Sequence, residues 1–269
     1  MFFVSFVSLV SLDLSIIIVS FNARPDLERC LQSLHDAPPA AAHEILVVDN
    51  GSTDGSVAVA RRWPDVRVIE VGSNVGFARA NNIGIRASAG TNLLLLNSDT
   101  IVPAASIDRL LGELARDPDV AVVGPRLVDA NGRPELSYGR MIGPLNELRQ
   151  KRRAQGRAVE ELTSRPLYPD WVSGACLLVR RADAEGVGGL DERYFMYTED
   201  VDFCAALRAR GRRILFTPDV EVVHLRGRSA ASAPTATRDA YRRSRIAFYE
   251  KHHPGWARLL KLYLRLRSL

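Results

Sequence analysis

Two short polar segments of the sequence carry residue types that can act on a phosphorylated substrate. The first is Asn97-Ser98-Asp99, which directly follows the four leucines Leu93–Leu96. Four consecutive leucines predict a strand that is buried on both faces of a parallel sheet. Ligands of open α/β sheets bind beyond the carboxyl ends of the strands. An amide oxygen and a carboxylate at such an end suit Mg²⁺ or Mn²⁺, which also hold phosphate oxygens. A turn in which Asp99 caps the next helix is the alternative.

The second segment is Thr198-Glu199-Asp200, at the start of a helix predicted over residues 198–210. Helical spacing places Asp200 on a face with apolar residues and Asp202 on another face. A carboxylate among apolar side chains needs a partner or a function, and in a cleft it could accept the proton of a substrate hydroxyl. The alternative is structural, with Thr198 as the N-cap and the acids favoured by the helix dipole.

His224 ends the apolar run Val220–Val223 and is a candidate cation ligand. Mn²⁺ accepts nitrogen ligands alongside oxygen, so His224 could complete a site with Asp99. A histidine with a purely structural role is the alternative.

Strands and helices alternate along the first half of the chain. Strands are expected at residues 15–20, 44–48, 66–71, 93–96 and 120–123, and helices at 25–35, around 57–63, at 77–87 and at 107–115. This alternation predicts an α/β fold with a doubly wound, mainly parallel central sheet and helices on both faces.

The alternation stops after residue 123. Asn131-Gly132 predicts a hairpin turn, and residues 143–169 form a long connection, either a functional loop or an insert. Strands are expected at 171–180, 214–216 and 220–225. The predicted organisation is an N-terminal extension over 1–12, one domain over 13–230, and a basic helical tail over 231–269. The extension has no basic residue, so a secretory signal is not expected.

Polar residues also follow the second and third predicted strands. Asp49 ends the second strand, and Asn74 and Gly76 follow the third. Because the carboxyl ends of parallel strands share one edge, these residues should lie near Asn97 and Asp99. Turn formation explains each polar residue alone, but does not require that they share an edge.

Composition narrows the class of protein. The chain has 269 residues, of which 46% are hydrophobic, enough for a full core. Its three cysteines have no metal-type spacing, which favours a reducing compartment over a disulfide scaffold. Residues 238–269 carry nine Lys and Arg against two Asp and Glu, a net +7 within a total of +5. The rest is therefore slightly acidic, which argues against nucleic-acid binding.

The C-terminal segment Trp256–Leu269 reads as a basic amphipathic helix. Helical spacing places the cations Arg258, Lys261 and Arg265 along one face. Another face carries the apolar residues Trp256, Leu259, Leu260 and Tyr263. Such a helix is typical of membrane-surface elements. A helix packed on the domain, or a contact between two copies in an oligomer, is the alternative.

Six segments taken in order resemble family-2 glycosyltransferases, and among them the bacterial rhamnosyltransferase-like branch. They lie between residues 15 and 229 and read Ile-Ile-Ile-Val-Ser-Phe-Asn, Val-Val-Asp-Asn-Gly-Ser-Thr-Asp-Gly-Ser, Asn-Val-Gly-Phe-Ala-Arg-Ala-Asn-Asn-Ile-Gly, Leu-Leu-Asn-Ser-Asp, Trp-Val-Ser-Gly-Ala and Tyr-Thr-Glu-Asp-Val-Asp-Phe. The resemblance implies a GT-A fold and an inverting transfer from a nucleotide-diphosphate sugar, with Mg²⁺ or Mn²⁺ as cofactor.

The resemblance also implies a role for individual residues. Asp200 corresponds to the catalytic base. Metal ligands are Asp99 and His224, and Asn97 departs from the stricter Asp-x-Asp motif, so weaker metal dependence is expected. The donor-binding residues are Ser20, Phe21, Asp49, Asn74, Arg79 and Asn97. The pocket for the transferred sugar and the acceptor contains Trp171, Gly174, Ala175 and Glu199.

The branch resemblance further implies an acceptor hydroxyl on a glycan or lipid-linked glycan, in cell-surface polysaccharide synthesis, with rhamnose as the candidate sugar. It implies a cytoplasmic enzyme held peripherally at the inner membrane face. Alternatives are a sugar-nucleotide-binding module without activity and a nucleotidyltransferase. The latter ordinarily has a glycine-rich basic loop after the first strand, where this chain has Phe21-Asn22-Ala23-Arg24. A dehydrogenase is disfavoured because G-x-G-x-x-G is absent there.

Overall fold

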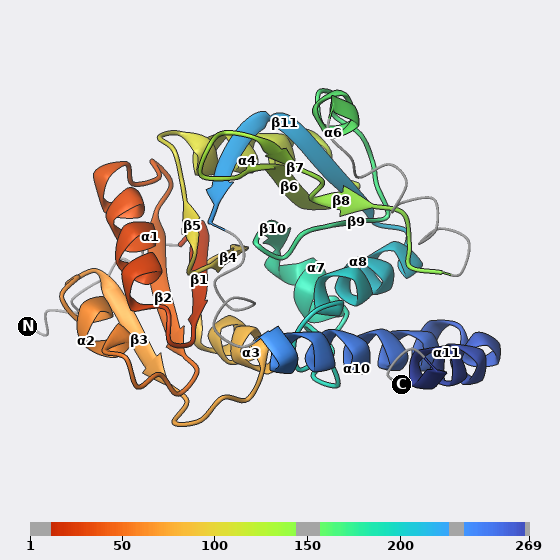
Figure 1. Cartoon of the computed structure of the whole chain (residues 1–269). Coiled ribbons are helices and arrows are strands. Elements are labelled where there is room, and N and C mark those ends of the chain that lie inside the picture. Colours follow the sequence, from red (N-terminus) through yellow and green to blue (C-terminus); the bar gives the residue numbers. More distant parts are fainter. Residues whose placement is uncertain (1–11, 144–156, 226–233, 267–269) are drawn as a thin grey trace, which may run out of the picture.

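The computed structural model describes residues 12–143, 157–225 and 234–266. Within these residues a nine-stranded sheet forms the centre of the fold (Figure 1). Its strands are β1 (Leu14–Ser20), β2 (His43–Asp49), β3 (Val66–Glu70), β4 (Asn92–Asn97), β5 (Thr100–Ile101), β6 (Val120–Val128), β7 (Pro134–Glu135), β10 (Cys176–Arg180) and β11 (Arg213–His224). Their order is β3-β2-β1-β4-β10-β6-β11-β5, with β7 paired to β6. A separate small sheet pairs β8 (Tyr138–Gly139) with β9 (Trp171–Val172).

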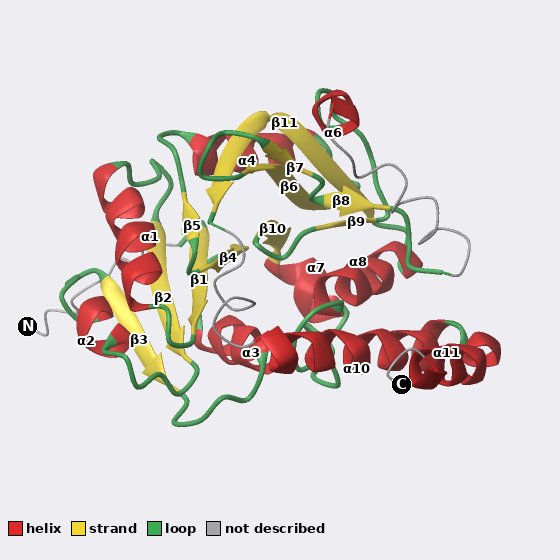
Figure 2. Ribbon diagram, in the orientation of Figure 1, coloured by secondary structure: helices red, strands yellow, loops and turns green. Residues whose placement is uncertain are grey.

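Helices cover both faces of the sheet (Figure 2). They are α1 (Arg24–Asp36), α2 (Ser56–Ala60), α3 (Phe77–Ala87), α4 (Ser106–Arg116), α6 (Arg157–Leu162), α7 (Arg181–Gly186), α8 (Glu199–Ala209), α10 (Pro234–His252) and α11 (Pro254–Leu266). Leucines of α1 and α4 fill the core on one face, and apolar residues of α3, α7 and α8 fill the core on the other. The predicted fold class is therefore confirmed.

Strand direction divides the sheet into two halves. Strands β3, β2, β1 and β4 are parallel throughout, as the alternating pattern predicts. Strand β10 then runs antiparallel between β4 and β6, and β11 pairs parallel with β6 and antiparallel with β5. The second half is thus mixed, because its strands are joined by hairpins and long excursions instead of short β-α-β crossovers. The hairpin at Asn131-Gly132 is confirmed by the antiparallel β6–β7 pair.

Two strand predictions were wrong, and both errors lie near polar residues of interest. The strand predicted over 171–180 is interrupted at residues 173–175, which separates β9 from β10. The backbone there turns to other partners, with Gly174 N–H bonded to Asp200 and the Ala175 carbonyl bonded to Asn97 N–H. The two short strands predicted over 214–225 form the single strand β11, with an irregularity between Thr217 and Glu221.

The tail helices pack onto the domain. A third apolar cluster joins Phe248, Tyr249, Ala257 and Leu260 of the tail to Tyr194 and Val201. The predicted boundary between residues 230 and 231 stays a prediction. The N-terminal extension before residue 12 and residues 144–156 of the 143–169 connection lie outside the described residues, and the described part of the connection contains α6.

Candidate active site

The carboxyl ends of the parallel strands bring the predicted polar residues to one rim of the sheet. In the register of the strands, Ser20 of β1 lies opposite Asp49 of β2, and Val19 lies opposite Asn97 of β4. The expectation that these residues share an edge is therefore confirmed. Which of these residues can bind a ligand depends on which of their polar atoms have no hydrogen-bond partner within the protein.

Asp49 is buried at this rim, and only one of its carboxylate oxygens is engaged. Oδ2 accepts hydrogen bonds from the backbone N–H groups of Gly51 at 3.1 Å and Ser52 at 3.0 Å. Oδ1 is buried and has no hydrogen-bond partner, and the same holds for Oγ of Ser20. Buried polar atoms normally have partners, so these two atoms mark a place for a polar ligand. The ring of Phe21 is exposed beside them.

Asn50, which the sequence analysis missed, ties the loop after β3 to the rim. Its side chain donates to Oδ1 of Asn74 at 2.9 Å and accepts from the N–H of Val75 at 2.9 Å. Asn74 also accepts from the N–H of Gly76 at 3.1 Å. The Asn74 side-chain oxygen is therefore engaged in shaping the loop. This interlock between two loops was not visible in the sequence, where Asn50 reads only as part of a turn.

Arg79 of α3 is engaged in an ion pair in the structure. Its exposed guanidinium on α3 lies 3.7 Å from the carboxylate of Glu192. A role in donor binding stays a prediction, and would require Arg79 to leave this exposed ion pair.

Asp99 and His224 meet because the short strand β5 pairs with the end of β11. Thr100 lies opposite His224, and the backbone N–H of Leu225 donates to the Asp99 carbonyl at 2.8 Å. This pairing leaves Nε2 of His224 3.3 Å from Oδ1 of Asp99. Nδ2 of Asn97 lies 3.4 Å from the same nitrogen, and Oδ1 of Asn97 is buried without a hydrogen-bond partner.

A second acid, Glu135 of β7, faces the other ring nitrogen of His224 and was missed by the sequence analysis. Its Oε2 lies 3.6 Å from Nδ1. Burial opposes protonation of the imidazole, but the carboxylates of Asp99 and Glu135 outweigh it and raise the pKa of His224 to about 9. Glu135 arrives through the β6–β7 hairpin, and its isolated position gave no signal in the sequence.

These residues fit a hard divalent cation that is completed by its substrate. In the described residues, no group of three or more His, Cys, Asp or Glu side chains is arranged to hold a metal by itself. Mg²⁺-type sites commonly use one or two protein carboxylates, with phosphate and water oxygens supplying the rest. Asp99, His224 and the unpartnered oxygen of Asn97 match that donor set, which Mn²⁺ also accepts because it tolerates nitrogen.

Asp200 is held at the interruption between β9 and β10. Its Oδ2 accepts from the N–H of Gly174 at 2.9 Å, and its Oδ1 accepts from the N–H of Val201 at 2.8 Å. A Cβ atom on Gly174 would lie 3.2 Å from Cβ of Asp200, so a larger residue would press on the carboxylate. Burial raises the pKa of Asp200, while the backbone hydrogen bonds oppose that rise. A carboxylate with raised pKa is a stronger base.

Glu199 is more deeply buried than Asp200 and has no hydrogen bond to Oε2. Burial, reinforced by the charge of neighbouring Asp200, raises its pKa well above the ordinary value. The interpretation of Thr198 as a side-chain N-cap was wrong, because its backbone is left-handed at φ 67° and its hydroxyl has no partner. Polar atoms without partners thus gather at the start of α8 as well.

One hydrogen bond joins the strand end that carries Asn97 to the segment that holds Asp200. The N–H of Asn97 donates to the carbonyl of Ala175 at 2.9 Å, next to Gly174. Trp171 closes the other end of this segment, where its indole N–H donates to the carbonyl of Arg140 at 2.9 Å. The structure therefore places the Asp99–His224 pair and Asp200 at the same rim.

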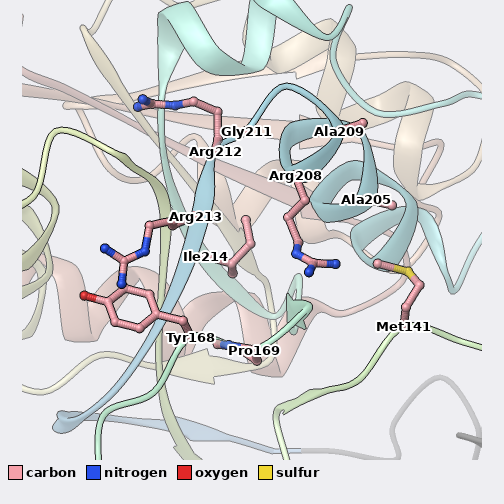
Figure 3. Close-up of a pocket in the computed structure, with 10 residues that line it drawn as sticks. All are labelled: Met141, Tyr168, Pro169, Ala205, Arg208, Ala209, Gly211, Arg212, Arg213 and Ile214. Carbon is pink, nitrogen blue, oxygen red and sulfur yellow. The ribbon is translucent and has the colours of Figure 1, made fainter.

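The cavity shown in Figure 3 is not part of this rim. It measures about 490 Å³ and is lined by Met141, Tyr168, Pro169, Ala205, Arg208, Ala209, Gly211, Arg212, Arg213 and Ile214. Arg208 is about 12 Å along α8 from Asp200 at the ordinary helical rise. Each of the three arginines is already paired with an aspartate, namely Asp170, Asp183 and Asp117. The cavity therefore offers no uncompensated cation for a phosphorylated donor.

Residues 15–182, more than half of the chain, match the family model for glycosyl transferase family 2. The chain belongs to this family. The resemblance seen in the six sequence segments is confirmed, and the protein is a glycosyltransferase. The alternative of a nucleotidyltransferase is set aside.

This family-2 glycosyltransferase is similar to curated relatives along most of its length. It is 34% identical over 268 residues to the N-acetylglucosaminyl-diphospho-decaprenol L-rhamnosyltransferase of Mycobacterium tuberculosis, covering 91% of this chain and 86% of the relative. It is 28% identical to a low-salt glycan biosynthesis hexosyltransferase of Haloferax volcanii, covering 79% and 67%. Its fold is similar to a mannosyltransferase from Pyrobaculum calidifontis solved with GDP-Man and Mn²⁺, with a TM-score of 0.64, 20% identity, and coverage of 93% and 68%.

Proposed function

We propose that this glycosyltransferase transfers a sugar, with inversion at the anomeric carbon, from a nucleotide-diphosphate sugar to a hydroxyl of a glycan or lipid-linked glycan. The observation that carries the proposal is the common position of three groups at one rim. Asp200 accepts from Gly174, the adjacent Ala175 accepts from Asn97, and the Asp99–His224 pair lies beside Asn97. The diphosphate of the donor, near the Asp99–His224 pair, and the hydroxyl of the acceptor, near Asp200, would then lie on opposite sides of the anomeric carbon.

The donor nucleoside would bind at the ends of β1 and β2. Oδ1 of Asp49 and Oγ of Ser20 are buried without partners, so they can bond polar atoms of the base or ribose. Phe21 offers an exposed ring beside them, and Asn74 shapes the adjacent loop. Arg79 could reach a phosphate on release from Glu192.

Asp99 and His224 would hold the divalent cation, Mn²⁺ or Mg²⁺, and the buried, unpartnered Oδ1 of Asn97 is a further candidate ligand. When bound, the cation neutralises charge that develops on the leaving diphosphate. The solved mannosyltransferase of similar fold carries Mn²⁺ together with its nucleotide sugar. The nitrogen ligand supports Mn²⁺ over Mg²⁺.

Asp200 would act as the general base. Its carboxylate takes the proton of the acceptor hydroxyl while that oxygen bonds to the anomeric carbon, and the bond from that carbon to the diphosphate oxygen breaks on the opposite face. No covalent sugar–enzyme intermediate is required. The N–H groups of Gly174 and Val201 orient the carboxylate, and Glu199, Trp171 and Ala175 would shape the pocket for sugar and acceptor.

The candidate donor sugar is rhamnose, and the candidate acceptor is a lipid-linked saccharide. Support comes from the 34% identity to an L-rhamnosyltransferase whose name specifies N-acetylglucosaminyl-diphospho-decaprenol. Cell-surface polysaccharide synthesis is the corresponding process.

A lipid-linked acceptor also calls for contact with a membrane surface, which we place on α11. Three of its apolar side chains are largely exposed: Trp256 (54%), Leu259 (57%) and Leu262 (56%). The exposed cations Arg258 and Lys261 flank them. None of the described helices is long and apolar enough to cross a bilayer, so the proposed contact is peripheral, at the cytoplasmic face.

One residue of the predicted apolar face does not belong to that surface. Leu260 is buried against the domain. The side chain of Arg265 lies outside the described residues. One face of α11 packs on the domain, as the alternative proposes, while another face is exposed. No oligomer is required by this arrangement.

Donor identity can be tested without knowledge of the acceptor. The protein should be heated with a panel of nucleotide sugars in the presence of Mn²⁺ or Mg²⁺, and its melting temperature measured. We expect the largest increase with dTDP-rhamnose and a metal ion, followed by transfer to a synthetic lipid-diphosphate N-acetylglucosamine. A larger increase with another nucleotide sugar would reject rhamnose, and an absence of transfer from every stabilising donor would reject the proposed reaction.

The membrane contact can be tested by flotation with vesicles of anionic or zwitterionic lipid. Trp256→Ser with Leu259→Ser should remove binding to anionic vesicles, because these side chains supply the exposed apolar surface. Tyr168→Ser, at an exposed aromatic residue of the domain, is the matched control. Equal flotation of all three proteins would contradict a role for α11.

A further inference from the structure

The segment that leads into α8 has a backbone that is unfavourable on its own. Tyr197 and Thr198 are consecutive non-glycine residues in the left-handed region, at φ 70° and φ 67°. Such conformations cost free energy and persist only where surrounding contacts impose them. Asp200 follows two residues later, so whatever holds this turn also sets the direction of the Asp200 carboxylate.

Helix α10 holds the carbonyl that immediately precedes this turn. Oγ of Ser244 donates a hydrogen bond to the carbonyl of Met196 at 2.7 Å, and Ser244 itself is buried. One helical turn earlier, the ring of Tyr241 packs edge-on to the ring of Tyr197, with 5.8 Å between centroids. The beginning of the turn is therefore fixed from the C-terminal tail.

Helix α10 also contacts α8 two residues after Asp200, at the buried side chain of Asp202. Asp202 is only 2% exposed, although the helical pattern placed it away from the inward face. Its Oδ2 accepts from Nζ of Lys251 at 2.7 Å, and its Oδ1 lies 2.6 Å from Nε2 of His252 and 3.1 Å from the Tyr194 hydroxyl. A buried carboxylate is strongly unfavourable without such partners.

Lys251 also closes the loop that precedes the turn. Its Nζ bonds to Asp191 at 2.8 Å as well as to Asp202, so one ammonium group joins both ends of residues 191–202. Burial opposes the charged form of Lys251, but the two carboxylates outweigh it and raise its pKa. The apolar residues Phe248 and Tyr249 pack against Tyr194 beneath these polar contacts.

The opposite side of this loop rests on α3, at the donor side of the rim. The carbonyl of Phe195 accepts from the N–H of Phe77 at 2.6 Å. A Cβ atom on Gly76, at φ 89°, would lie 2.6 Å from that carbonyl, so only glycine permits this approach. The loop is thus held between the donor-side helix α3 and the tail helix α10.

We propose that α10 is a positioning element of the active site, in which Ser244, Lys251 and His252 hold the strained Tyr197–Thr198 turn so that Asp200 stays directed at the acceptor. The proposal rests on the proposed function of Asp200 as the base. It assigns the tail a part in the reaction beyond attachment, because the contacts that pack the tail are the contacts that fix the base. It also predicts that loosening them slows the transfer step and leaves donor binding intact.

Lys251→Met tests this directly, because it removes the ammonium and keeps an unbranched side chain that is one heavy atom shorter. A small misplacement of a catalytic group can reduce the rate up to about 100-fold. We expect kcat to fall about tenfold, with donor affinity unchanged. Lys251→Arg, which can restore both ion pairs, should return kcat to within about threefold of the wild type. Arg243→Ala, at an exposed position of the same helix, is the matched control.

Hydrogen–deuterium exchange supplies a readout that does not depend on transfer. Amides of residues 194–202 should exchange faster in Lys251→Met than in Lys251→Arg or Arg243→Ala. If the wild-type protein transfers no sugar but residues 194–202 still exchange faster in Lys251→Met, the proposed function is rejected. The positioning of this segment by α10 is then still supported. Should Lys251→Met fail to fold, Ser244→Ala is measured in its place, with the same expected loss of kcat.

Two results would overturn the proposal. The first is a folded Lys251→Met or Ser244→Ala variant with wild-type kcat and wild-type exchange. The second is a loss that falls on donor affinity as much as on kcat, or that Lys251→Arg does not recover, since that pattern indicates general destabilisation.

Discussion

The proposed donor side and the proposed catalytic side of the rim are built in different ways. On the donor side, Asp49 is held by N–H groups two and three residues further along the chain. On the catalytic side, Asp200 is held by Gly174, 26 residues away, and Asp202 is held by Lys251, 49 residues away. The Asp49 carboxylate is therefore held within one local turn, whereas the carboxylates of Asp200 and Asp202 depend in part on distant segments. Binding at Asp49 should tolerate damage to the tail, and the orientation of Asp200 should not.

Asp200→Asn should produce the largest difference between the effect on transfer and the effect on donor binding. Asparagine can still accept the Gly174 hydrogen bond but cannot take a proton, so we expect transfer to fall more than about 1,000-fold with donor binding unchanged. Quenched-flow assays and calorimetry measure the two quantities. Transfer within about tenfold of wild type would remove Asp200 from the reaction.

Asp99→Ala should have the next largest effect, on binding of nucleotide with metal. Loss of the carboxylate should weaken Mn²⁺-dependent nucleotide binding about 100-fold, the upper end of the loss caused by removing a residue that only supports a metal ligand. Calorimetry with and without Mn²⁺ measures this, with Asp65→Ala, at an exposed aspartate, as control. Equal affinity of Asp99→Ala and wild type in Mn²⁺ would contradict the metal role.

Asp49→Asn should affect only the donor side. A hydrogen bond to a charged group contributes about 1.5–3 kcal/mol, so donor affinity should fall about tenfold or more while kcat stays within about twofold. Titration of the donor followed by saturation kinetics distinguishes the two. A fall in kcat with unchanged donor affinity would reverse the assignment of the two sides.

The smallest effect expected is on the pH dependence. Because burial raises the pKa of Asp200, its proton is retained at a pH above the ordinary value for an aspartate. The base is active only when ionised, so kcat should fall tenfold per pH unit below an apparent pKa that exceeds 3.8. This apparent pKa belongs to the interacting Asp200–Glu199 pair and not to one residue. The same apparent pKa is expected in Asp49→Asn. An apparent pKa below 3.8 would contradict the burial of the base.

The contrast also explains what the sequence could predict. Periodicity and strand ends located Asp49, Asn97 and Asp99, because parallel strands place their carboxyl ends on one edge. The helical pattern and a family segment located Asp200, and His224 was located by its position at the end of an apolar run. Glu135, Lys251 and the Asp202 contacts were missed, since they depend on which distant elements pack together. The break at Gly174 was missed for a similar reason, because its backbone bonds to a side chain on another element.

The most direct test of a shared rim is a crystal structure with Mn²⁺ and an unreactive analogue of the donor sugar nucleotide. We expect Mn²⁺ bound by Asp99 and His224, the diphosphate bound to the metal, and the free face of the anomeric carbon turned toward Asp200. A metal bound elsewhere, or an anomeric carbon whose free face points away from Asp200, would contradict the proposed reaction.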